Sequence, residues 1–196
     1  MFSEDHLMQA RAALRQPQEC RLRDGTPVVV RPIGPEDKER LQRGLRELSG
    51  RSRYHRFLAS VKELSAEQLR YLTEIDYVDH MAWIALDPAL PAEPGVGVGR
   101  YIRLAQEPHV AEAALTVAER YQGRGAGALL LDLLSRCAVV EGISTFRAHI
   151  LQSNVAALRL VRHLGGTVTR EDGTLLRLDV PVRASAELVG AAPPQA

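Results

Sequence analysis

Cysteine and lysine are both scarce in this chain of 196 residues, which contains only Cys20 and Cys137, and only Lys38 and Lys62. Two cysteines in unlike sequence contexts provide no disulfide framework, so we expect a reducing, cytoplasmic location. Arginine therefore supplies almost all of the positive charge, and 24 acidic residues balance it to a net charge of +1. Because the chain has no basic tail or stripe, we expect no nucleic-acid partner.

Long hydrophobic runs are also missing. No apolar stretch approaches the roughly 18–20 residues that a membrane-spanning helix requires, so no membrane partner is expected. The hydrophobic residues, 45% of the chain, are enough for one folded domain that needs no disulfide or structural metal. We expect this domain at residues 21–183, between an N-terminal extension at 1–20 and a flexible tail at 184–196.

The apolar patterns predict a mixed α/β domain. Helical spacing predicts helices over residues 7–14, 36–48, 52–57, 65–75, 128–140 and 153–164, the last capped by Ser153. Short β-branched or alternating runs predict strands over 21–23, 28–30, 81–86, 96–102, 110–117, 145–151, 167–170 and 175–180. Asp-Gly pairs at 24–25 and 172–173 predict hairpin turns between neighbouring strands.

A glycine-rich loop, Gln122-Gly123-Arg124-Gly125-Ala126-Gly127, joins one of these strands to the apolar helix at 128–140. Residues without a Cβ let the backbone turn tightly and present successive N–H groups, and the helix dipole adds to their attraction for a phosphate. Arg124 adds a charged donor. The loop therefore predicts an anion-binding site.

Three phosphate-containing ligands are candidates for this loop. A mononucleotide P-loop requires Gly-Lys-Ser or Gly-Lys-Thr, and the chain has no Gly-Lys pair. A dinucleotide fold requires G-x-G-x-x-G at its first strand and several βαβ units after it, whereas only about seventy residues remain here. The third candidate is the pyrophosphate of coenzyme A.

The loop resembles that of the GNAT superfamily of acyl-coenzyme-A-dependent N-acetyltransferases, whose pattern Gln122, Gly125 and Gly127 fill. The resemblance continues in the next helix, where Asn154, Ala157 and Leu164-Gly165 match the family. It implies a GNAT fold, with a central mixed, mostly antiparallel sheet of about seven strands flanked by helices. It also implies acetyl-CoA as the acyl donor, no metal, and a homodimer as one possible assembly.

The resemblance also implies which residues bind the donor. Backbone groups of the strand before the loop would bind the pantetheine, the loop and helix start would bind the pyrophosphate, and the next helix would complete the site. These residues are Leu115, Val117, Gln122, Gly123, Arg124, Gly125, Ala126, Gly127, Ala128, Asn154 and Ala157.

Other segments resemble the bacterial protein-lysine acetyltransferase (Pat) branch, namely Val30–Ile33, Ser52–Tyr54, Phe57, Glu63–Ser65 and Ile75–Tyr77. The acceptor implied by this branch is a lysine side chain of a protein. A small amine is the alternative acceptor, and an acyl-CoA sensor without turnover is the alternative from a different functional class.

Transfer to an amine requires a base, because only the neutral amine attacks. In the strand at 110–117, Glu112 shares one face with Ala114 and Thr116, and it is the only acidic residue there. Related enzymes often carry a glutamate base about this far before the loop glutamine, so we predict Glu112 as the general base. The alternative is a strand glutamate that only faces solvent.

Two further features concern the acceptor and the leaving group. Glu74, Asp76 and Asp79 precede the strand at 81–86, and their charge predicts attraction of the acceptor amine; a solvated acidic loop is the alternative. Many family members carry a tyrosine that protonates the leaving thiolate, but Val161 stands there, so no general acid is assigned. Gly166 also replaces a frequent phenylalanine. The six histidines show no metal-ligand spacing: His6, His55, His80, His109, His149 and His163.

Overall fold

The computed structural model describes residues 4–93 and 95–183, so the predicted tail at 184–196 lies outside the described residues. Eight strands form one sheet in the order β1-β2-β3-β4-β5-β6-β8-β7. The strands are β1 (Gln18–Arg21), β2 (Pro27–Pro32), β3 (His80–Leu86), β4 (Gly97–Leu104), β5 (Glu107–Val117), β6 (Thr145–Leu151), β7 (Thr167–Asp172) and β8 (Leu175–Pro181). The helices are α1 (Glu4–Leu14), α2 (Lys38–Glu47), α3 (Gly50–Phe57), α4 (Ala66–Thr73), α5 (Ala126–Val140) and α6 (Val155–His163), with 3-10 turns at Pro35–Asp37 and Glu119–Tyr121.

The predicted mixed sheet is confirmed, with eight strands instead of about seven. Every neighbouring pair is antiparallel except β5 and β6, which are parallel. The predicted hairpin at Asp172-Gly173 is confirmed, because Asp172 pairs directly with Leu175. The hairpin at Asp24-Gly25 is longer than predicted. The Leu22 N–H donates to the Thr26 carbonyl within the loop, so β1 ends at Arg21, not at 23 as predicted, and a five-residue loop follows.

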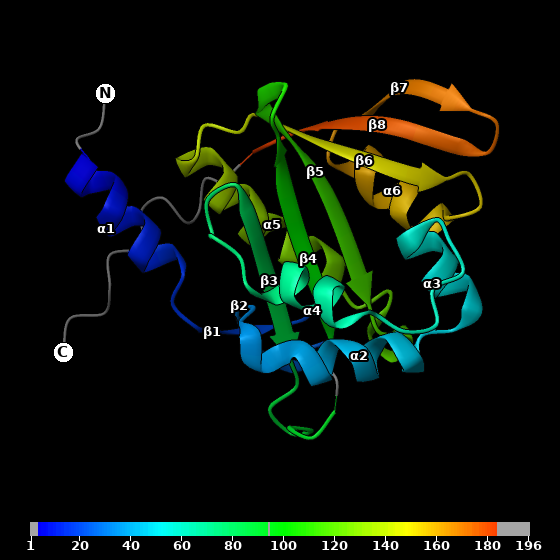
Figure 1. The fold of residues 1–196 in the computed structure, drawn as a ribbon, viewed down its shortest axis with the longest axis horizontal. Helices are drawn as coiled ribbons and strands as arrows, with labels where there is room; N and C mark the ends of the chain where they lie inside the picture. Colours follow the sequence, from blue (N-terminus) through cyan, green and yellow to red (C-terminus); the bar gives the residue numbers. More distant parts are fainter. Residues whose placement is uncertain (1–3, 94, 184–196) are drawn as a thin grey trace.

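Helices cover both faces of the sheet. Figure 1 shows α2, α3 and α4 over one face and α5 and α6 over the other. The N-terminal helix α1 packs beside α5, where Arg11 forms an ion pair of 2.6 Å with Glu141. No helix in the described part of the chain combines the length and apolar character needed to cross a membrane.

The apolar side of α5 builds the core beneath the sheet. Leu130, Leu134 and Cys137 lie one helical turn apart and are buried against residues such as Trp83 and Tyr101. Each fully buried leucine contributes about 2 kcal/mol of transfer free energy. Burial raises the pKa of the Cys137 thiol to about 11, which agrees with the packing role that the sequence predicts for this row.

Candidate functional site

The sheet opens between β5 and β6. Only three rows of residues pair these strands, and the last row joins Glu112 to Arg147. Beyond that row, β5 continues along β4 to Val117, while β6 continues along β8 to Leu151. The two strands therefore part after Glu112. Leu115 lies in the stretch of β5 that pairs with β4 on one side and with no described strand on the side of the opening.

The glycine loop lies where this unpaired stretch of β5 ends. Gly123 and Gly125 have φ values of +75° and +94°, in the left-handed region that other residues rarely adopt, and Gly125 is the N-cap of α5. The Gln122 side chain donates to the Val117 carbonyl at 3.1 Å and ties the loop to the strand. The helix begins at Ala126, not at 128 as predicted. The first amides of α5 therefore belong to Ala126, Gly127 and Ala128, and they have no partner within the helix.

Arg124 projects from the same loop but already has protein contacts. Its guanidinium lies 3.3 Å from an Asp24 oxygen and over the Tyr121 ring, and its backbone carbonyl accepts a hydrogen bond from the Arg23 N–H at 2.9 Å. The side chain is nevertheless 43% exposed. Its charge is therefore available to an anion at the outer edge of the loop.

Asn154 lies at the other side of the opening and caps α6. Its Oδ1 accepts a hydrogen bond from the Ala157 N–H at 3.2 Å, so the cap is Asn154 and not the predicted Ser153. Because the cap uses only the amide oxygen, the Asn154 NH₂ group remains able to donate to a ligand. Ser153 contacts α3 instead, with its Oγ 3.1 Å from Nε2 of His55.

Helix α3 lies across the opening and is anchored on both sides. On the β6 side, Arg51 donates to the Ser153 carbonyl at 3.1 Å. On the β5 side, Glu119 accepts hydrogen bonds from the Ser49 N–H and the Ser52 hydroxyl, both at 3.0 Å. These bonds lower the pKa of Glu119. The helix thereby places its side chains directly over β5.

Glu112 stands at the point where the strands part. The predicted division of β5 is confirmed, because Glu112, Ala114 and Thr116 line cavities on the α2–α4 face, whereas the alternate residues pack on the core. The Glu112 side chain is 54% exposed, and its carboxylate lies 3.8 Å from Nδ1 of His149. Arg147, its partner in the last paired row, is held by Asp179 at 2.9 Å and by Glu107. The carboxylate thus faces a cavity and solvent together.

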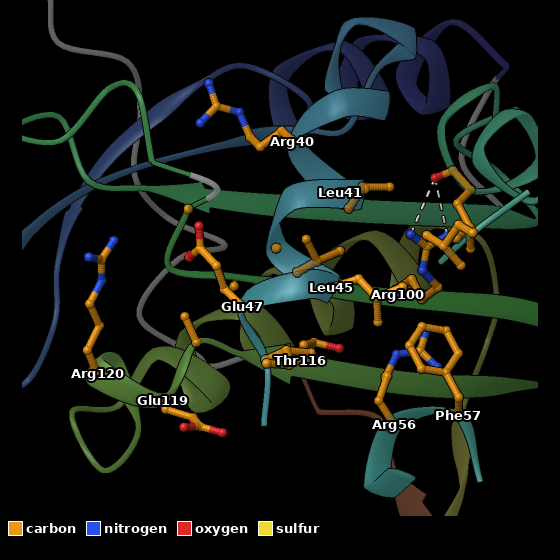
Figure 2. Close-up of a pocket in the computed structure, with 18 residues that line it drawn as sticks. Arg40, Leu41, Leu45, Glu47, Arg56, Phe57, Arg100, Thr116, Glu119 and Arg120 are labelled. Atoms are coloured by element: carbon orange, nitrogen blue, oxygen red, sulfur yellow. Dashed lines mark hydrogen bonds between the residues drawn. The ribbon is translucent and has the colours of Figure 1, made fainter. Parts of the chain in front are cut away.

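Two adjoining cavities lie on this face, with volumes of about 240 and 270 Å³. The first lies between α2 and the ends of β4 and β5, and the second contains Glu112. Figure 2 shows Leu41 and Leu45 of α2 over the first cavity, with Arg56 and Phe57 reaching from α3 toward Arg100. Both cavities share five lining residues: Arg56, Phe57, Leu64, Leu72 and Arg100.

Sequence reasoning missed Arg56 and Arg100. Arg100 is only 5% exposed, and its guanidinium donates to the Leu72 carbonyl at 3.3 Å and contacts Nε2 of His80 at 2.9 Å. Burial and the nearby charge of Arg56 lower the pKa of Arg100 to about 9. Burial also lowers the pKa of Arg56, and the charge of Glu112 opposes that shift. The available signal was the single charge of Arg100 within the apolar strand at 96–102.

The three predicted acceptor-binding carboxylates lie outside both cavities, and each has a protein partner. Glu74 pairs with Lys38, and Asp79 pairs with Arg103 at 2.6 Å. Asp76 accepts the backbone N–H groups of residues 78–80. Desolvation acts to raise the pKa of Asp76, but these three donors lower it overall. Acceptor binding by the three residues therefore stays a prediction.

The two departures from the family pattern touch each other. A Cβ at Gly166 would lie 2.3 Å from Cγ1 of Val161 and 2.9 Å from its carbonyl oxygen. Val161 is buried, so it presents no polar group to the opening. A side chain at 166 would therefore clash with both the backbone and the side chain of Val161.

Within residues 4–93 and 95–183, no group of three or more His, Cys, Asp or Glu side chains is arranged to hold a metal ion. The polar groups at the opening are instead backbone amides, the Asn154 side chain and the Glu112 carboxylate, and the guanidiniums of Arg56 and Arg100 line both adjoining cavities. The backbone amides and the Asn154 side chain suit a ligand that carries phosphates and amides. The Glu112 carboxylate and the guanidiniums suit a second, charged ligand in the cavities.

Comparison with known proteins agrees with this geometry. Residues 53–165 match the model of the Acetyltransferase (GNAT) family. The chain is 35% identical over 171 residues to Acetyltransferase Pat of Mycolicibacterium smegmatis, covering 87% of this chain and 50% of that protein. It is 39% identical over 110 residues to Acetyltransferase PA5475 of Pseudomonas aeruginosa, covering 56% of this chain and 59% of that protein. The chain thus spans about half to three-fifths of the length of these relatives.

Solved structures show the same relationship. The GNAT domain of S. lividans PAT superposes with a TM-score of 0.77 at 31% identity, covering 84% of this chain and 96% of that domain. A cAMP-binding acyltransferase from Mycobacterium smegmatis superposes with a TM-score of 0.64 at 31% identity, covering 96% of this chain and 54% of that protein. The family match, the sheet that opens after Glu112 and the glycine loop lead to one conclusion: the chain is a member of the GNAT acetyltransferase family.

Proposed function

We propose that this chain transfers an acetyl group from acetyl-CoA to a primary amine, with a lysine side chain of a protein as the acceptor. The observation that carries the proposal is the position of Glu112, at the row where β5 and β6 part and on the face that holds the cavities. A base at that position lies between the opening, where acetyl-CoA would bind, and the cavities, where the acceptor amine would bind.

The donor side would hold acetyl-CoA through backbone groups. The unpaired backbone at Leu115 and Val117 would bind the pantetheine amides, as an added strand binds a sheet edge. The glycine loop and the first amides of α5 would bind the pyrophosphate, with Arg124 at the outer edge. Asn154 would donate its free NH₂ group from the opposite side.

The chemistry assigns Glu112 a proton-transfer role. A lysine amine is protonated near neutral pH, so it must lose a proton before its lone pair can attack the thioester carbonyl. Glu112 accepts that proton, directly or through one water, before the attack. The N–C bond then forms, the C–S bond breaks, and the nitrogen releases its second proton to solvent. A backbone N–H of the unpaired stretch would stabilise the carbonyl oxygen while negative charge develops there. With Val161 at the usual tyrosine position, the thiolate takes its proton from solvent.

The proposed acceptor class rests on the similarity to Acetyltransferase Pat of Mycolicibacterium smegmatis and to the GNAT domain of S. lividans PAT. The cavities are compatible with it, because they are open toward solvent beside Glu112, whose side chain is 54% exposed. A lysine on a protein surface can therefore reach the carboxylate without burial of the whole acceptor.

Coenzyme A release, measured with acetyl-CoA and a panel of lysine-containing proteins, peptides and small amines, tests this function. Mass spectrometry of the products identifies the acetylated atom. We expect release with acetylation of protein lysines, and its loss in Glu112→Gln. Release with small amines alone would replace the protein acceptor by a small-molecule one. Tight binding of coenzyme A without release across the panel would contradict catalysis and indicate an acyl-CoA sensor.

A further inference from the structure

Two guanidiniums in the acceptor cavities have no carboxylate partner. Arg100 is 5% exposed, and its recorded contacts are the Leu72 carbonyl and the His80 ring. Arg56 lies over the ring of Phe57, with its Cζ 5.0 Å from the ring centroid. Among the described residues, neither arginine forms an ion pair.

The other arginines that line the first cavity differ in this respect. Arg40 lies 3.6 Å from Asp37, and Arg120 lies 3.1 Å from Glu93. Each of them therefore has a carboxylate within ion-pair distance, although Asp37 also binds Arg31 at 2.7 Å. Among the arginines that line the cavities, Arg56 and Arg100 are thus the two without a carboxylate of the described chain within ion-pair distance, and both line both cavities.

Burial makes this arrangement unfavourable without a ligand. A cation removed from water loses hydration, and a carbonyl and a neutral imidazole compensate only part of that loss. The surroundings are largely apolar, with Phe57, Leu64 and Leu72 among the shared lining residues. A low-dielectric environment strengthens the attraction of these guanidiniums for an anion. Glu112 supplies one negative charge to the second cavity, so the two guanidiniums are suited to one further anionic group.

The position of Glu112 indicates that the anionic group belongs to the acceptor. It lines the same cavity as Arg56 and Arg100, so one negative and two positive groups face a shared space. An acceptor that carries an ammonium beside a carboxylate matches both ends of this arrangement. We propose that Arg56 and Arg100 bind a carboxylate of the acceptor located next to its reactive amine, an inference that rests on the proposed function.

The carboxylate has two possible sources with the same chemistry. One is an aspartate or glutamate beside the acceptor lysine in a protein, and the other is the α-carboxylate of a free amino acid. The planar guanidinium binds either through paired N–H donors. The two sources are separated by the choice of acceptor in the test.

The test compares matched acceptors on the full chain with acetyl-CoA. One pair of peptides carries a single lysine flanked by aspartates or, in the second peptide, by asparagines. A second pair is free lysine and lysine amide. The variants are Arg56→Gln, which removes the charge, and Arg56→Lys, which keeps it. Arg46→Gln is the control, because Arg46 is exposed on α2 and lines neither cavity. Fluorescence anisotropy of the labelled peptides, recorded with coenzyme A present, measures their Kd independently of turnover.

We expect the wild type to favour the carboxylate-bearing member of at least one pair. In Arg56→Gln, KM and Kd for that acceptor should rise about tenfold or more, while those for its neutral partner change less than about twofold. Arg56→Lys should restore part of the preference, and Arg46→Gln should retain all of it. A preference within the peptide pair identifies a protein side chain as the source, and one within the lysine pair identifies a free amino acid.

Equal use of both members of each pair by the wild type would overturn the proposal, as would an equal loss for both in Arg56→Gln. An Arg56→Gln effect on KM for succinyl-CoA, with none on the acceptors, would overturn it by assigning the guanidiniums to the acyl group. Failure of the proposed function has a different signature, namely no coenzyme A release with any acceptor. In that case, the Kd values of the aspartate and asparagine peptides still test whether the guanidiniums bind a carboxylate.

Discussion

The proposed donor side and the proposed acceptor side of the opening are organised differently. On the proposed donor side, the polar groups belong to two short stretches, the glycine loop at 122–127 and the helix start at Asn154. A hydrogen bond within a few residues holds each stretch, and the Arg23 N–H adds one distant contact to the loop. On the acceptor side, Glu112, Arg56 and Arg100 come from β5, α3 and β4, and only tertiary packing brings them together. A site made from backbone groups is specified locally, whereas a site made from charged side chains depends on the whole fold.

The largest effect that tests this difference is expected at Glu112. Glu112→Gln keeps the size of the side chain but cannot accept a proton, so kcat should fall about 10²–10⁴-fold. KM and Kd for acetyl-CoA should stay nearly constant, because the donor side is built from other groups. Steady-state coenzyme A release measures both parameters. Glu171→Gln on the exposed strand β7 is the matched control. A kcat reduced by less than about twofold would remove Glu112 from the mechanism.

The second effect concerns the buried pair beneath the acceptor cavities. Burial, together with the charge of Arg100, lowers the pKa of His80 to about 4. In the unfolded chain the imidazole titrates near its ordinary value of 6.5, so on acidification the unfolded state binds a proton first. Stability that is present above pH 6.5 is therefore lost as the pH falls toward 4. Between about pH 7.5 and about pH 5 the loss should be about 2 kcal/mol.

Urea unfolding of the wild type and His80→Gln at the two pH values measures this loss. The variant keeps a hydrogen-bond acceptor but has no titrating ring, so its pH dependence should be shallower by that amount. His163→Gln, at the exposed end of α6, should keep the wild-type dependence. Identical pH dependence in the wild type and His80→Gln would show that the acceptor side does not depend on a neutral His80.

A third, smaller effect tests the local character of the donor side. Alanine is strained at the φ of +94° that Gly125 adopts, so Gly125→Ala should distort the loop and raise KM for acetyl-CoA about three- to tenfold. Acceptor KM should not change. Gly142→Ala is the control, because Gly142 has a φ of +72° at the opposite end of α5 and should lose stability without a change in KM. An effect of Gly125→Ala on both substrates would contradict the division into two independent sides.

The smallest effect is expected for the acidic residues beside β3. Glu74 and Asp79 are engaged by Lys38 and Arg103, in exposed ion pairs of the kind that contribute about 0–1 kcal/mol. The double variant Glu74→Gln, Asp79→Asn should change acceptor KM less than about twofold. Acceptor titrations at fixed acetyl-CoA measure it. A rise of more than about fivefold would bring these residues into the acceptor site, as their charge predicts.

Much of the fold follows from sequence patterns, and the exceptions have local causes. The alternation along 110–117 predicts which face of β5 is polar, and the row of Leu130, Leu134 and Cys137 predicts the core face of α5. The two-residue turn predicted at Asp24-Gly25 is wrong, because the Leu22 N–H bonds to the Thr26 carbonyl and lengthens the loop. The cap of α6 was misjudged by one residue, since Ser153 bonds to α3 and Asn154 takes the capping role.

The sequence by itself determined the donor side, because glycines, a helix start and an N-cap act through groups within a few residues of each other. It also determined the family, since those motifs are contiguous. Only the tertiary structure decided where β5 and β6 part, which depends on their pairing with β4 and β8. The tertiary structure likewise brought Arg56 to Arg100. The burial of a charge and the absence of its counter-ion are properties of packing among distant segments.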